Sequence, residues 1–186
     1  MKTHFDIETI VEQGSITNEL DYERALIADR KLRLLAKDSL HFKNLRIKLR
    51  NLIGKYEDAE WNDVDQIDDT KILESEKSER IAAFERVFIE SRKQAIKNKL
   101  KEFDLTQENL ALILGHKSKT HMSELINGIK PFTLRDLVII NRLLKIEINQ
   151  LVPIFLSQDD QVKIKYAVKQ IDKPKLKLTS DDLLVL

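Results

Sequence analysis

Basic and small polar side chains gather between Thr106 and Pro131, around two short apolar stretches. Ammonium and hydroxyl groups of this kind can donate hydrogen bonds to phosphates and to base edges. Lys119 could reach the acceptors of guanine, and Thr120 or Ser123 could contact either a base edge or a phosphate. The same residue types also cover ordinary solvated helices. Their meaning therefore depends on the elements that position them.

Capping residues and glycines divide this segment into short helices. A side-chain oxygen at a helix start accepts a bond from an otherwise unpaired N–H, and glycine tolerates the left-handed conformation that ends a helix. The expected caps are Thr106, Ser118 and Thr133, and the expected ends are Gly115 and Gly128. The side chains predicted to face inward are Leu110, Ala111, Leu114, Met122, Leu125 and Ile126.

This arrangement resembles the helix-turn-helix domain of the Cro/repressor class of bacterial and phage regulators. The matching positions are Thr106-Gln107, Gly115, Ser118 and Asn127-Gly128. The resemblance covers about residues 91–156 and implies a five-helix unit whose second short helix enters the major groove of DNA. The sequence departs from the family pattern in three ways. The turn HKSK is one residue longer than usual, Lys117 stands where an apolar residue is common, and Glu124 occupies a place where Arg is common.

The resemblance implies contacts from the start of the second short helix and from the turn before it. The DNA-binding residues expected on this basis are Gln107, Lys117, Ser118, Lys119, Thr120, His121 and Ser123. One such domain reads few bases, so a homodimer on double-stranded operator DNA is expected.

The first 103 residues show mainly helical patterns. Apolar residues at steps of three and four predict two helices, the first capped by Thr17 or Asn18, that pack as a hairpin. Residues 1–15 show no clear period and predict an extended or partly ordered arm. The acidic stretch 57–70 is either a solvated connector or an acidic docking segment, and the spacing of Trp61, Val64 and Ile67 by threes fits a short helix within it. From about Leu73 to Phe103 the pattern fits one helix or two.

A second resemblance lies in this first part of the chain. Residues 17–25 (TNELDYERA) and 52–57 (LIGKYE) resemble the N-terminal helical region of HigA antitoxins. The resemblance implies a type II antitoxin that neutralises a small basic ribonuclease of the HigB/RelE kind and represses its own operon. The residues expected to contact the toxin are Tyr22, Tyr56, Glu57 and Trp61. A stand-alone repressor without a toxin partner is the alternative.

The charge distribution fits two different partners. Residues 1–90 contain 15 Lys and Arg against 20 Asp and Glu, whereas residues 91–150 contain 11 against 6. An acidic first half suits a basic protein partner, and a basic middle suits nucleic acid. The N-terminus lacks the apolar core of a secretory signal and no apolar run is long enough to span a membrane, so a cytoplasmic protein with no membrane partner is expected.

Catalytic and metal chemistry find little support in the sequence. There is no cysteine, no phosphate-cradling glycine loop and no nucleophile motif. The histidines at positions 4, 41, 116 and 121 fit no familiar metal-ligand spacing. We therefore expect no enzyme activity, no cofactor and no metal site.

Only 4 Gly and 3 Pro in 186 residues favour an all-α fold. The tail is the exception, because VKIKYAV and KLKL alternate as strands do, which leaves a short strand or partial disorder open. The expected division is 1–70, helical region for toxin binding or dimerisation with its acidic connector; 71–90, connecting helix; 91–156, helix-turn-helix domain; and 157–186, tail.

Overall fold

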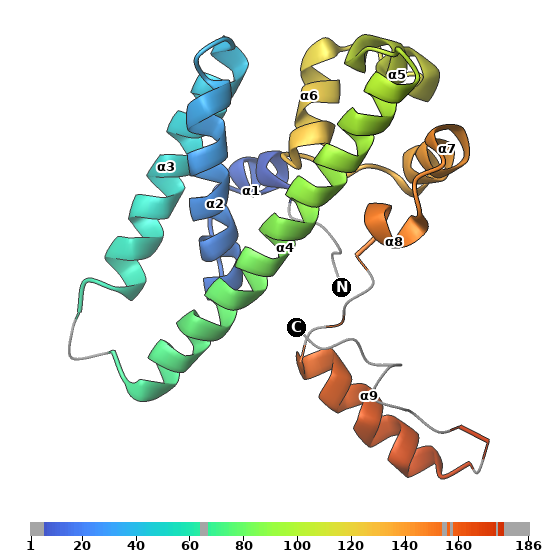
Figure 1. Ribbon diagram of the computed structural model, residues 1–186. Helices are drawn as coiled ribbons and strands as arrows, with labels where there is room; N and C mark the ends of the chain where they lie inside the picture. The colour runs from blue at the N-terminus through green and yellow to red at the C-terminus, as the bar shows by residue number, and fades with distance from the viewer. Residues whose placement is uncertain (1–5, 64–66, 154–155, 157, 174, 177–186) are drawn as a thin grey trace. The chain divides into compact units, whose positions relative to one another are not determined.

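The structure is a computed structural model, which describes residues 6–63, 67–153, 156, 158–173, 175 and 176. The all-α prediction is confirmed, since the described residues form helices and no strand (Figure 1). The helices are α1 (Ile7–Gln13), α2 (Glu19–Leu35), α3 (Leu40–Glu60), α4 (Asp69–Glu102), α5 (Gln107–Leu114), α6 (Lys119–Asn127), α7 (Leu134–Leu144), α8 (Ile148–Leu151) and α9 (Gln158–Ile171). The chain divides into two compact units, Met1–Leu151 and Val152–Leu186. None of the described helices has the length and apolar character that crossing a membrane requires.

Helix α1 corrects the expectation of an extended N-terminal arm. Asp6 caps this helix by accepting a hydrogen bond from the Thr9 N–H at 3.2 Å, and Gly14 ends it with a φ of 76°. Ile7 and Ile10 are only 1% and 8% exposed. A helix of seven residues is too short to establish a period in the sequence, so its two buried isoleucines gave no clear signal. Residues 1–5 of the predicted arm lie outside the described residues.

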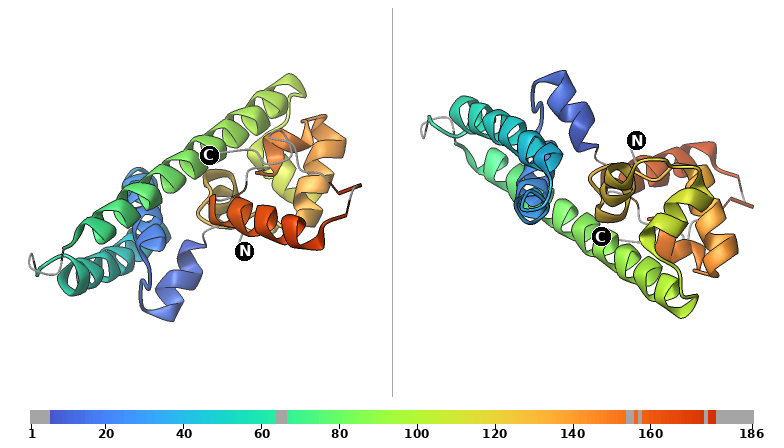
Figure 2. Two further views of the ribbon diagram at one scale, coloured as in Figure 1. Left: turned by 90° about the horizontal axis from the view of Figure 1, so that it is seen from below. Right: turned by 90° about the horizontal axis from the view of Figure 1, so that it is seen from above.

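The predicted hairpin of α2 and α3 is confirmed (Figures 1 and 2). Asn18, one of the two expected caps, begins α2, and Ser39 begins α3. The two helices enclose an apolar core with α1. Its buried members are Ile7, Ile10, Ile16, Ala25, Ala28, Leu32, Phe42, Leu45, Leu49, Leu52, Ile53 and Ile129.

Helix α4 is continuous over 34 residues, which answers the question of a break near Ser91. Its first half packs against α2, and the helix also contacts α5, α6, α7 and α8. Ile96 and Leu100 are buried in its second half, whereas Phe103, just after the helix, is exposed. Arg92 is buried too: its Nη1 donates to the Leu151 carbonyl at 3.3 Å, and burial lowers the pKa of its guanidinium to about 10.

The helix-turn-helix pattern folds as its caps predicted. Thr106, Ser118 and Thr133 each accept a hydrogen bond from the backbone N–H three residues ahead. Gly115 and Gly128 end α5 and α6 with φ values of 81° and 67°. The six side chains expected to face inward are all buried, namely Leu110, Ala111, Leu114, Met122, Leu125 and Ile126. The last short helix of this unit, α8, begins at Ile148 and ends at Leu151.

The end of α6 is tied to the N-terminal helices. Ile129, which follows α6, lies in the apolar core of α1–α3 and is 0% exposed. Its carbonyl accepts a hydrogen bond from the Ile7 N–H at 3.2 Å, while Lys31 Nζ donates to the Asn127 carbonyl at 2.7 Å. The two halves of the Met1–Leu151 unit therefore share one core at this point.

The second unit contains α9, where a strand was considered for the segment VKIKYAV. That prediction is wrong, because residues 162–168 lie inside this helix. Within the segment only Ile164 and Val168 are not exposed, and with the preceding Gln161 they are spaced by three and four as on one helix face. In the segment KLKL, Lys175 and Leu176 are not in a strand, and residues 177–178 lie outside the described residues.

Candidate nucleic-acid interface

The predicted DNA-binding residues surround the N-terminal end of α6. Lys117, Ser118 and Lys119 are exposed, and the other four are partly buried. A groove of about 440 Å³ runs between α5 and α6. It is lined by Gln107, Glu108, Ala111, Leu112, Gly115, His116, Lys117, Lys119 and Met122.

The burial of one face of α6 determines which residues point outward. Met122, Leu125 and Ile126 are 1% to 2% exposed, so the helix cannot rotate without losing its core contacts. Ser118 closes the first turn by accepting the His121 N–H at 3.1 Å. The remaining N–H groups of the first turn have no intrahelical partner and favour negative charge nearby. The end of α6 thus combines two lysines with the positive end of a helix dipole.

Lys119 is paired across the groove with an acid of α5. Its Nζ lies 2.7 Å from Glu108 Oε1, and the two side chains are 81% and 53% exposed. The hydrogen bond and the charge of each partner raise the pKa of Lys119 and lower that of Glu108. An ion pair in open water is weak, so a phosphate or a guanine can replace Glu108 as the partner of Lys119.

Two of the predicted residues have internal partners. His121 Nδ1 lies 3.3 Å from Glu124 Oε2, and its ring contacts the ring of His116 edge-on with 4.9 Å between centroids. Ser123 accepts hydrogen bonds from Asn127 Nδ2 through its carbonyl at 2.8 Å and its Oγ at 3.3 Å. The structure therefore groups Lys117, Ser118, Lys119 and Thr120 at the open end of α6, with His121 and Ser123 behind them.

Three of the four predicted toxin-contact residues belong to the α2–α3 interface. Tyr22 and Tyr56 stack with 4.9 Å between ring centroids. The Tyr22 hydroxyl donates to Glu57 Oε1 at 2.8 Å, and the Tyr56 hydroxyl donates to Glu19 Oε2 at 3.0 Å. Burial, together with these hydrogen bonds, raises the pKa of both tyrosines well above its usual value. These contacts give Tyr22, Tyr56 and Glu57 a structural role within the hairpin.

Trp61 lies apart from them, at the end of α3. Its indole Nε1 is buried, and no acceptor for it exists within the part of the chain that the structure describes. Lys71 Nζ lies 5.2 Å from the ring centroid and 3.1 Å from Glu60 Oε2. The exposed acids of this end of the hairpin and of the start of α4 are Asp58, Glu60, Asp63, Asp68, Asp69, Glu74 and Glu76. We call these seven residues the acidic end.

A larger groove, of about 960 Å³, runs between α2 and α4 and has the opposite charge. Its basic residues are Arg30, Lys31, Arg33, Arg86 and Lys93, beside the apolar Ile27, Leu34 and Val87. A basic protein would be repelled here and attracted at the acidic end.

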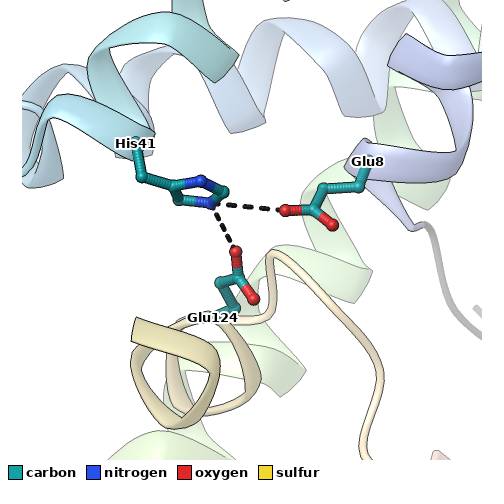
Figure 3. A group of neighbouring side chains, drawn as sticks. All are labelled: Glu8, His41 and Glu124. Atoms are coloured by element: carbon teal, nitrogen blue, oxygen red, sulfur yellow. Dashed lines mark hydrogen bonds and ion pairs between the residues drawn. The ribbon is translucent and has the colours of Figure 1, made fainter. Parts of the chain in front are cut away.

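One cluster was not predicted from the sequence. Glu8 of α1, His41 of α3 and Glu124 of α6 meet beside the C-terminal half of α6 (Figure 3). The sequence did not indicate this group, because its three residues lie far apart in the chain, whereas familiar metal-binding motifs place their ligands at short spacing. The one available signal was Glu124: a helix that places Met122, Leu125 and Ile126 inward brings this acid close to the core, where it needs a partner.

A scan against protein-family models, a search of curated proteins and a search of solved structures each gave no match to this chain.

Proposed function

We propose that this chain is a transcriptional repressor that reads double-stranded operator DNA with the N-terminal end of α6. The observation that carries the proposal is the joint exposure of Lys117, Ser118 and Lys119 at the positive end of a helix whose opposite face is buried. A short helix held in this way can enter the major groove end-on.

The exposed residues divide into two roles. Lys119, at the first position of α6, would read guanine through its N7 and O6 acceptors, and Thr120 would contact an adjacent base edge. Gln107 and Lys117 line the groove between α5 and α6. Together with Ser118 they would bind phosphates, which fixes the register on DNA and carries little sequence information. His121 and Ser123, which have internal partners, would support this surface from behind.

A homodimer would double the number of bases read, and α7 offers an exposed face for it. Leu134 and Val138, one turn apart, are 72% and 39% exposed. We propose that a second copy covers them. Leu134→Lys with Val138→Lys should shift the sedimentation coefficient from dimer to monomer. Leu40→Lys, at a site 71% exposed on α3, is the control and should leave it unchanged. A monomeric wild-type chain would contradict the dimer.

Selection from random duplexes would supply the operator, and fluorescence anisotropy would compare it with unrelated DNA. Lys119→Ala with Thr120→Ala should lower the ratio of specific to non-specific affinity at least about tenfold, since each good base contact contributes about 1–3 kcal/mol. Lys48→Ala removes an exposed lysine of α3 and should preserve the ratio. Selection that enriches no sequence, or an unchanged ratio in the double variant, would argue against reading by α6.

We also propose that the chain is an antitoxin whose acidic end binds a small basic ribonuclease of the HigB/RelE kind. The specific observation in favour is the acidic end, which also contains Trp61, whose indole N–H has no acceptor among the described residues. Indole groups are frequent interface anchors, and opposite charge accelerates encounter. Among the four residues expected from the sequence, Trp61 is the one retained as a direct contact.

Co-expression with the product of an adjacent small reading frame tests this second proposal. Rescue of growth and co-purification should be lost in Glu60→Lys with Asp63→Lys, and kept in the control Glu12→Lys on α1. Point substitutions test the acidic end more specifically than a deletion of residues 1–70 would. Ile129 packs in the core that those residues form, so the deletion would also disturb the fold around α6. If no neighbouring product is toxic or co-purifies, the stand-alone repressor remains.

A further inference from the structure

The cluster of Glu8, His41 and Glu124 brings three metal-ligating side chains together from α1, α3 and α6. One ligand atom from each lies within 4.8 Å of the other two. His41 Nε2 lies 2.6 Å from Glu124 Oε1 and 3.3 Å from Glu8 Oε1 (Figure 3). Each of the two glutamates therefore directs its own Oε1 at the Nε2 of His41.

Glu124 is buried, so its carboxyl oxygens depend on partners within the protein. Its side chain is 4% exposed, although it stands on the outer helix of the DNA-binding unit. Its oxygens lie 2.6 Å from His41 Nε2, 3.3 Å from His121 Nδ1 and 3.5 Å from Lys130 Nζ. A buried acidic side chain needs partners of this kind.

Lys130 supplies one positive charge, from the opposite side of the carboxylate pair. Its Nζ contacts Glu8 Oε2 and lies 3.5 Å from Glu124 Oε2. Two acidic side chains beside a single lysine leave room for a further cation. Because Lys130 holds the Oε2 atoms, the Oε1 atoms stay directed at His41, as outer partners orient the ligands of a metal.

We propose that Glu8 Oε1, His41 Nε2 and Glu124 Oε1 bind a divalent transition-metal ion of the Zn²⁺ class, with Lys130 as an orienting residue and water at the open position. Ligands about 2.0–2.1 Å from a tetrahedral ion lie roughly 3.3 Å apart. The distance from His41 to Glu8 already has this value, and the distance from His41 to Glu124 must open slightly. His41 is 43% exposed, which gives the ion and its water access.

Imidazole with two carboxylates is a borderline donor set that suits Zn²⁺, Co²⁺, Ni²⁺ or Mn²⁺ better than Ca²⁺ or Mg²⁺. The ion would join α1 and α3 to α6, at the point where the N-terminal core and the DNA-binding unit already share Ile129. His121 Nδ1 is directed at Glu124 Oε2, the oxygen on the Lys130 side, and is therefore left outside the ligand set.

Calorimetric titration of the chelator-treated full chain with Zn²⁺ tests the proposal, supported by the visible spectrum with Co²⁺. The wild type should bind one ion per chain and give the intense absorption of four-coordinate Co²⁺. Glu8→Gln and His41→Gln should each weaken Zn²⁺ binding at least about tenfold. Glu12→Gln, the same change one turn away on the exposed side of α1, and His121→Asn should bind Zn²⁺ within about twofold of the wild type.

Three results would overturn the proposal. The first is a wild type that binds no Zn²⁺ at millimolar concentration. The second is wild-type affinity in Glu8→Gln and His41→Gln. The third result applies if those variants do not fold, and it comes from the imidazole NMR signals of the wild type. We expect the signals of His41 to shift when Zn²⁺ is added. Shifts confined to His4, His116 or His121 would place the ion elsewhere. No DNA enters the test, so its outcome is independent of the proposed repressor function.

Discussion

Lys119 Nζ and Glu108 Oε1 lie 2.7 Å apart, so the first side chain of α6 is paired with the first turn of α5. Any DNA phosphate that approaches Lys119 also approaches this acid. Glu108 therefore both holds Lys119 in place and opposes the ligand that we propose for it.

Glu108→Gln should tighten binding to any duplex DNA. An ion pair in open water is weak, so the expected gain in affinity is about two- to fivefold, with a steeper dependence on salt. Fluorescence anisotropy at several salt concentrations measures both. Glu102→Gln is the matched control, because Glu102 forms a similar 2.7 Å pair with Lys99 on α4, away from the α5–α6 groove. Weaker binding by Glu108→Gln would show that the acid mainly positions Lys119.

Gly128→Ala should destabilise the fold more than Gly14→Ala. Both glycines have a positive φ, 67° and 76°, but a Cβ at Gly128 would lie 2.6 Å from Ile89 Cγ2, whereas nothing lies within 4 Å at Gly14. Backbone strain alone costs about 1 kcal/mol, and the clash should add about 1–3 kcal/mol. Urea denaturation gives both free energies of unfolding. Equal free energies of unfolding for the two variants would mean that Ile89 moves aside without a cost in stability.

The stability of the fold should rise between pH 8 and about 10. Burial lowers the pKa of Lys31 from 10.5 to about 8, while its Nζ donates to the Asn127 carbonyl. In this window the unfolded chain holds a proton on Lys31 that the folded chain has released, so the free energy of unfolding increases with pH. We expect a rise of about 1–2 kcal/mol, allowing for water around the amine.

Denaturation at a series of pH values measures this rise, and Lys31→Met should remove it while the control Lys48→Met retains it. Above pH 10 the two tyrosines with raised pKa values act in the opposite direction, because they release protons more readily in the unfolded chain. A flat profile from pH 8 to 10 in the wild type would contradict the burial of a neutral Lys31.

Tyr22→Phe and Tyr56→Phe should affect folding and leave toxin capture intact. Each removes a hydroxyl that donates to a glutamate, and each should cost about 1–2 kcal/mol in the free energy of unfolding because the acid loses its partner. Thermal denaturation measures the loss, and co-purification with the partner measures capture. Tyr166→Phe, on the separate α9, should not change the melting of the Met1–Leu151 unit. Loss of capture without loss of stability would return both tyrosines to the interface.

Local signals in the sequence predicted the three helices between Gln107 and Leu144 well. Thr106, Ser118 and Thr133 cap helices through their own side chains, and Gly115 and Gly128 end them through their own backbone. These effects act within four residues, so a single sequence contains them. The same holds for the buried faces of α5 and α6, which follow from helical spacing alone.

Features that depend on distant residues were missed. Helix α1 is stabilised by the burial of Ile7 and Ile10 against α3, which no local pattern records. In α9 the alternation of Val162, Ile164 and Tyr166 resembled a strand, although Ile164 with Gln161 and Val168 equally forms a helical face. The meeting of Glu8, His41 and Glu124 depends on three helices and could come only from the fold.

Helix α4 has a mechanical consequence. Its 34 residues extend about 50 Å at 1.5 Å per residue, without a proline or glycine at which a kink could form. It begins among the residues of the acidic end and ends in contact with α5. The helix therefore fixes the distance between the two proposed binding surfaces. A partner held at Asp69 would stand at a fixed height from DNA held by α6, and two copies on one operator would hold their partners at a spacing that the DNA itself sets.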